Sequence, residues 1–225
     1  MKRLRQLLTI AEMQGRDLLR RRGALLMLAA MPLAFYFALL GKGAYAITTG
    51  GVGMAFSISG AALFSMLAAK RIEPRLVLAG YRPLDLLAGR LLLLEGLGLV
   101  IVLATTALMT LVSRPPHPEL VLAGIALVVW VAVPLGLAIA TLIARELEGV
   151  LTAIGVVGVQ LSLPLDSPAA PFLPLYGPLQ LLARGGGIRG ALLAGVGSGL
   201  AYGAALLGIA GIAWRHRLHV RTAAG

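Results

Sequence analysis

The chain consists of long apolar stretches separated by short segments that carry nearly all of the charges. Six stretches hold at most one charged residue each: 23–41, 47–69, 91–112, 120–144, 150–163 and 191–214. An α-helix advances about 1.5 Å per residue, so about twenty apolar residues cross the roughly 30 Å hydrocarbon layer of a bilayer. We therefore predict an all-α membrane protein with six transmembrane helices, of which the fifth is short.

Two further segments complete the predicted architecture. Residues 1–22 place leucines on one helical face and arginines around the other, which predicts an amphipathic interfacial helix that serves either as a lipid anchor or in coupling to a partner. Residues 164–184 are apolar but contain five prolines. Because lipid does not tolerate exposed irregular backbone, we predict that this outer segment is a re-entrant hairpin buried against protein.

Small residues recur every four positions in the second and the last apolar stretch, which predicts close contact between helices. They are Gly53, Ser57 and Ala61 in the second stretch, and Gly195, Gly199 and Gly203 in the last.

Composition supports a membrane protein and indicates its orientation. The chain is 59% hydrophobic and 13% charged, whereas an ordinary globular chain is about one quarter charged. The net charge of +11 does not indicate nucleic-acid binding, because the basic residues sit at the ends of apolar stretches. The N-terminal segment, the 70–90 segment, the turn near residue 145 and the basic tail 215–225 hold sixteen of the twenty Lys and Arg residues. Cytoplasmic loops are enriched in Lys and Arg, so we expect a multi-pass protein of the inner (plasma) membrane with both termini in the cytoplasm.

Residues that could perform chemistry are scarce. The chain has no cysteine, only three histidines and no G-x-x-x-x-G-K-[ST] sequence, so we predict no metal, no cofactor and no ATPase site of its own. Glu95 is the one acidic residue within the apolar stretches. It either extends to the nearby membrane surface or pairs with a basic neighbour such as Arg90, or it binds a proton or substrate. Ser57 and Gln160 are the other candidates for a transport path or a helix contact, although Ser commonly bonds back to its own helix.

The order of these segments resembles the ABC-2-type permease family, the membrane subunits of ATP-binding cassette exporters. The resemblance covers nearly the whole chain and is carried by Asp17-Leu18-Leu19-Arg20-Arg21-Arg22, Lys70-Arg71-Ile72-Glu73, Pro83 followed by Gly89-Arg90, and Pro174 with Pro178. It implies a dimer of six-span subunits, identical or related, each paired with a cytoplasmic ATPase that holds ATP and Mg. It also implies that the 70–90 segment contains a coupling helix, whose contacts with the ATPase would be Glu73, Arg75, Leu76, Leu78, Tyr81 and Arg82.

On this basis we expect a permease subunit that exports a hydrophobic or amphipathic substrate such as a drug, a lipid or a peptide. The stiff outer segment would act as the external gate, formed by Pro164, Pro168, Phe172, Pro174, Tyr176 and Pro178. The alternative is a membrane scaffold or immunity protein that binds a partner and transports nothing. A membrane enzyme is the weakest hypothesis, because the chain offers no convincing pair of nucleophile and base.

Overall fold

The computed structural model describes residues 12, 15, 22–70, 72–143, 145–184 and 189–223, and within these ranges all regular structure is helical. The prediction of an all-α protein is confirmed for this part of the chain. The predicted interfacial helix 1–22 lies outside the described residues, apart from Glu12, Gly15 and Arg22.

Six long helices and three short ones make up the described chain. Their bounds are α2 Arg22–Ala38, α3 Ala44–Ala69, α4 Glu73–Leu78, α5 Pro83–Ser113, α6 Pro118–Leu142, α7 Glu146–Ser162, the 3-10 helix η1 Ala170–Phe172, α8 Tyr176–Arg184 and α9 Arg189–Ala223. Four helices are long and apolar enough to cross a membrane, namely α3, α5, α6 and the Leu193–His216 part of α9. This is the helix content of a multi-pass membrane protein.

Two of the observed helices are longer than the predicted ones. Helix α5 begins at Pro83, so the second half of the predicted 70–90 segment forms the first two turns of α5. Proline is favoured in a first helical turn, and residues 84–90 contain no second proline that would interrupt the helix. Helix α9 continues to Ala223, so most of the predicted tail 215–225 extends the last helix.

The turns between the helices follow from their residues. Gly41 and Gly43 adopt positive φ angles of 94° and 58° between α2 and α3, a conformation that glycine adopts at little cost. Helix α5 ends at Ser113, its C-cap Arg114 has a left-handed φ of 45°, and Pro115 and Pro116 follow. Because proline cannot continue a helix, the chain turns there and restarts at Pro118.

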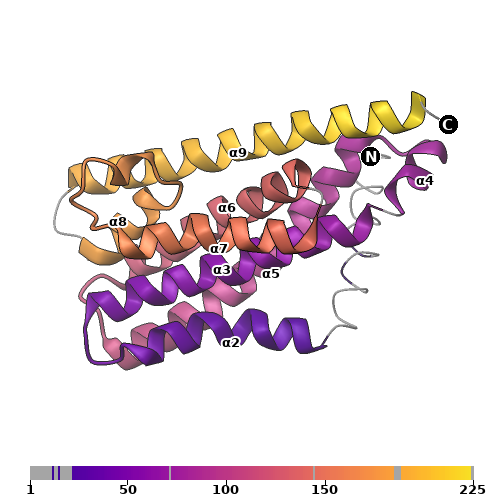
Figure 1. Ribbon diagram of the computed structural model, residues 1–225. Coiled ribbons are helices and arrows are strands. Elements are labelled where there is room, and N and C mark those ends of the chain that lie inside the picture. Colours follow the sequence, from indigo (N-terminus) through magenta and orange to yellow (C-terminus); the bar gives the residue numbers. More distant parts are fainter. Residues whose placement is uncertain are drawn as a thin grey trace.

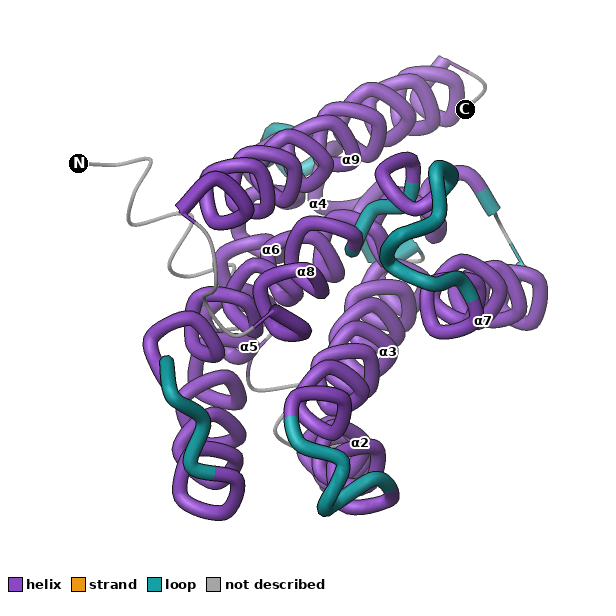
Figure 2. The backbone as a smooth tube through the Cα atoms, turned by 90° about the vertical axis from the view of Figure 1, so that its left-hand side faces the viewer, coloured by secondary structure: helices purple, strands orange, loops and turns teal. Residues whose placement is uncertain are grey.

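The long helices run side by side, with α4 and the C-terminal end of α9 at one end of the molecule and α8 at the other (Figure 1). We call these the α4 end and the α8 end. Viewed from the α8 end, α6 lies among its neighbours rather than at the edge (Figure 2). In the most apolar stretch of α6, 72% of the residues are buried, compared with 17% in α9. Helix α6 is therefore the centre of the bundle.

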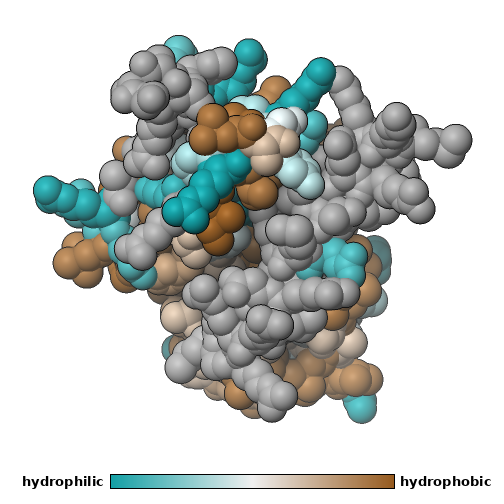
Figure 3. Space-filling view, turned by 90° about the vertical axis from the view of Figure 1, so that its right-hand side faces the viewer, coloured by the Kyte–Doolittle hydropathy of each residue, from teal (hydrophilic) through white to brown (hydrophobic). Residues whose placement is uncertain are grey.

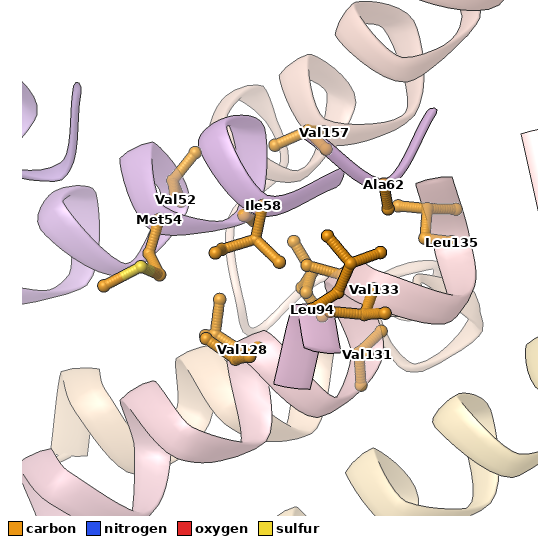
Figure 4. Packing of buried hydrophobic residues seen from close by; sticks show 14 of the residues in the cluster. Val52, Met54, Ile58, Ala62, Leu94, Val128, Val131, Val133, Leu135 and Val157 are labelled. Carbon is orange, nitrogen blue, oxygen red and sulfur yellow. The ribbon is translucent and has the colours of Figure 1, made fainter. Parts of the chain in front are cut away.

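Buried side chains of α3, α5, α6 and α7 form one core (Figure 4). Large apolar side chains also remain exposed on the outward faces of the helices, for example Leu103 on α5, Leu151 on α7 and Ile212 on α9, each more than half exposed. Water would not favour so much exposed apolar surface, whereas the hydrocarbon of a bilayer would cover it.

Glycines allow the central helices to approach closely. A Cβ atom added at Gly136 of α6 would lie closer than 3.0 Å to the backbone oxygen of Ser59 on α3. The predicted small-residue face of the last helix also packs closely against other residues of the bundle. Gly195 lies against Gly177, Gly199 against Pro178, and Gly203 against Trp130. The prediction of close packing is confirmed for these glycines, and the contacts lie within one chain.

Candidate functional site

The short helix α4 connects two long helices at the α4 end. Pro74 stands in its first turn, and Gly80 ends the segment with a positive φ of 94°. The Tyr81 backbone N–H donates to the Leu76 carbonyl at 3.0 Å, which closes the turn in the manner of a helix C-cap. Arg82 then adopts an extended conformation, and Pro83 starts α5. The local sequence thus makes a short helix with a defined end on each side.

Apolar and basic side chains are exposed together around α4. Leu78 is 79% exposed and Ile72 is 59% exposed, while Arg75 and Arg82 are exposed as well. Leu76 and Tyr81 are half-buried. Figure 3 views this end of the molecule and shows hydrophobic and hydrophilic residues side by side on it. We call Ile72, Arg75, Leu78 and Arg82 the α4 surface.

Glu73 does not belong to this surface, although the resemblance places it among the coupling contacts. Its side chain is buried, and its Oε1 accepts a hydrogen bond from Arg90 Nη2 at 2.6 Å. A partner that docks on the α4 surface therefore cannot touch Glu73 in this conformation. A carboxylate between two helices is stable there only when it is paired, as Glu73 is with Arg90. The contact of Glu73 with an ATPase stays a prediction of the resemblance.

The same contact bears on Glu95, for which Arg90 was one of the suggested partners. Arg90 binds Glu73 on α4, and its Nη1 lies 2.5 Å from Met66 Sδ on α3, so it does not pair with Glu95. Burial raises the pKa of the Glu73 carboxyl, and the Arg90 guanidinium counteracts this shift only in part. The pair is incompletely bonded, since Glu73 Oε2 and Arg90 Nε are buried without a hydrogen-bond partner.

The three candidate path residues lie on three different helices. Ser57 donates to the Gly53 carbonyl of its own helix at 3.0 Å, which is the structural alternative expected for serine. Glu95 Oε1 on α5 and Gln160 Oε1 on α7 are buried without a hydrogen-bond partner. No hydrogen bond between described residues joins any two of the three, and their role in a transport path stays a prediction.

The predicted gate residues are spread along the segment before and within α8. Pro164, Pro168 and Phe172 are exposed, Pro174 and Tyr176 are partly buried, and Pro178 is buried. Tyr202 Oη on α9 donates to the Pro171 carbonyl at 2.8 Å, which joins this segment to a long helix. Within the segment, Gln180 Nε2 on α8 donates to the Leu165 carbonyl at 3.5 Å.

Helix α8 itself is inserted among three long helices. Leu179 and Leu182 are buried, and a Cβ atom added at either Gly51 of α3 or Gly124 of α6 would lie closer than 3.0 Å to Leu182. On its other side, a Cβ at Gly177 would lie closer than 3.0 Å to the Gly195 carbonyl of α9. Helix α8 is therefore a packed part of the core.

Sequence reasoning missed three residues that form tertiary contacts at the two ends of the molecule. Met66 contacts Arg90 at the α4 end, whereas Gln180 and Tyr202 donate hydrogen bonds at the α8 end. Each forms its contact with a residue at least fifteen positions away, and none belongs to a recognisable motif. A polar residue within an apolar stretch, as Tyr202 is, was the only available signal.

Known proteins add no further assignment. No protein-family model matches the chain, and no curated protein matches it significantly. Within the described residues, no group of three or more His, Asp and Glu side chains is placed to hold a metal ion. The α4 surface, with the Glu73–Arg90 pair beneath it, is the candidate site with the best-defined geometry.

Proposed function

We propose that the chain is the membrane subunit of an ABC-2-type exporter, driven by a separate ATPase that docks on the α4 surface. The observation that carries this proposal is the α4 surface itself. Leu78 and Ile72 are exposed at an end of the molecule where Arg75 and Arg82 are also exposed. Exposed leucine and isoleucine beside arginines are typical of a surface that another protein covers.

Six spans fit the helix arrangement. Helices α2 and α7 have 17 residues each, about 25 Å in length, which is near the lower limit for crossing the hydrocarbon layer. Helix α7 lies against α3 and α6, and its buried positions recur about every four residues, at Gly149, Ala153, Val157 and Gln160. Its other faces expose large apolar side chains, as expected of a helix that contacts lipid.

A re-entrant outer segment fits the packing at the α8 end. The chain between α7 and α8 is mostly non-helical, so its backbone groups need partners other than those within a helix. Tyr202 and Gln180 provide two of these partners. The buried leucines of α8 supply the apolar anchor, and Phe172, 80% exposed, is the foremost apolar side chain of the proposed gate.

The α4 end is assigned to the cytoplasm because α4 and the basic end of α9 both lie there. The chain contains no cysteine, so a single introduced cysteine reports one position. With intact cells and a membrane-impermeant maleimide, Phe172→Cys is expected to label at once, and Leu78→Cys only after permeabilisation. Labelling of Leu78→Cys in intact cells would contradict the cytoplasmic placement of α4 and remove the docking proposal.

Docking of the ATPase is tested by Leu78→Glu combined with Arg82→Glu, which replaces apolar and basic contacts by acidic ones. We expect at least a tenfold loss of ATPase activity that co-purifies with the tagged chain in detergent, because buried interface anchors contribute on the order of 2 kcal/mol each. Phe172→Glu is the matched control, since its side chain is equally exposed at the opposite end. Equal ATPase recovery with both variants would favour a membrane scaffold without a motor.

The proposed cargo is hydrophobic or amphipathic, because the described long helices present apolar side chains and few charges. The proposed assembly is a dimer of such subunits with two ATPases, in which each ATPase supplies the ATP and Mg site.

A further inference from the structure

Arg90 connects three helices through one guanidinium group. The residue belongs to α5, its Nη2 donates to Glu73 of α4 at 2.6 Å, and its Nη1 lies 2.5 Å from the sulfur of Met66 on α3. Both charged side chains are almost fully buried, with 1% exposure for Arg90 and 2% for Glu73. These contacts join the end of α3, the start of α4 and the second turn of α5.

Stability alone does not explain a pair of this kind. Removing two charges from water is costly, and well-packed apolar residues of similar size often stabilise a protein as well or better. The distinctive property of the pair is its geometry, because the planar guanidinium fixes the direction of each contact. A six-residue helix has too few turns to hold its own orientation, so α4 depends on such a contact.

We propose that Arg90 and Glu73 are positioning residues that lock α4 to α3 and α5, so that these three helix ends move as one rigid unit. This inference rests on the proposed function, in which force on the α4 surface reaches the long helices. A loosely attached α4 would yield when an ATPase pushed on it. A locked α4 transmits the displacement to α3 and α5 together.

Distances between spin labels on the full chain in lipid nanodiscs test the lock. One label is placed at Leu78→Cys on α4 and the other at Leu151→Cys on α7; both side chains are more than half exposed. A reference pair at Leu103→Cys and Leu200→Cys reports the bundle between α5 and α9. We expect Glu73→Gln and Arg90→Gln to broaden the α4 distance distribution at least twofold and to leave the reference distribution unchanged.

The pairing is tested by the double variant. Since Glu73 acts through its contact with Arg90, Glu73→Gln with Arg90→Gln is expected to broaden the distribution no more than Arg90→Gln alone. Glu148→Gln, which breaks the exposed Arg145–Glu148 pair, is the matched control and is expected to have no effect. An unchanged α4 distribution in Glu73→Gln, or additive broadening in the double variant, would overturn the proposal.

Equal broadening of the reference pair would also overturn it, because the charge pair would then support the whole bundle rather than α4. These distances are measured without an ATPase. The two proposals can therefore fail separately. If the spin-label distances behave as expected but Leu78→Glu with Arg82→Glu does not reduce ATPase recovery, the proposed function is contradicted and the lock is retained.

Discussion

Gly136→Ala is expected to destabilise the protein by about 3 kcal/mol, the upper part of the range for overpacked cores. The added methyl group would lie closer than 3.0 Å to the backbone oxygen of Ser59 and to the Cβ of Ala62. Neither atom belongs to a flexible side chain, so α3 and α6 must move apart. Because α6 is the central helix, the displacement disturbs contacts on several sides. The measurement is the apparent free energy of unfolding in detergent micelles.

Gly208→Ala is the matched control for this substitution. Gly208 lies within α9, and a Cβ added there meets no atom within 4 Å. Alanine is a better helix former than glycine, so the control is expected to be neutral or slightly stabilising in the same unfolding assay. Equal losses in both variants would show that α3 and α6 do not pack as closely as described.

Arg90→Leu is expected to cost about 3–5 kcal/mol in the free energy of unfolding, since it leaves the Glu73 carboxylate buried without its partner. The double variant Glu73→Leu with Arg90→Leu is expected to recover most of this loss, because no unpaired charge then remains. Unfolding in detergent measures both quantities.

Arg145→Leu provides the comparison for an exposed arginine. Arg145 also forms an ion pair, with Glu148 at 2.9 Å, but its side chain is 81% exposed. Water and salt screen such a pair, so its loss is expected to change stability by less than about 1 kcal/mol. If Arg90→Leu costs no more than Arg145→Leu, then water reaches the Glu73–Arg90 pair.

The long helices could be predicted from the sequence because their signals are local. An uninterrupted apolar stretch, a Pro-Pro turn or a glycine that permits positive φ acts within a few residues. The Gly195, Gly199 and Gly203 pattern was informative for the same reason, since the spacing of four places all three on one helical face. The pattern could not tell whether the contact lies within one chain or between two copies.

The candidate site was harder to predict because the orientation of α4 depends on tertiary contacts. Helix α4 is too short to show a hydrophobic period, so the sequence does not reveal which side faces inward. The coupling role of Glu73 came from the resemblance, whereas its burial follows from the position of Arg90, seventeen residues away. The α5 start at Pro83 was missed because the charges at Asp85 and Arg90 assigned residues 83–90 to the segment between two spans. A helix can continue through such charges where it leaves the apolar stretch.

Helix α9 has 35 residues and is therefore about 52 Å long. A bilayer with its headgroup layers is about 40–45 Å thick, so an upright helix of this length protrudes from the membrane by several ångströms. Helix α4 contacts α9 and lies beside its C-terminal end, so in the proposed orientation the α4 surface lies near the cytoplasmic edge of the bilayer. An ATPase docked on the α4 surface, as we propose, would then approach the protein from the aqueous side of the lipid headgroups.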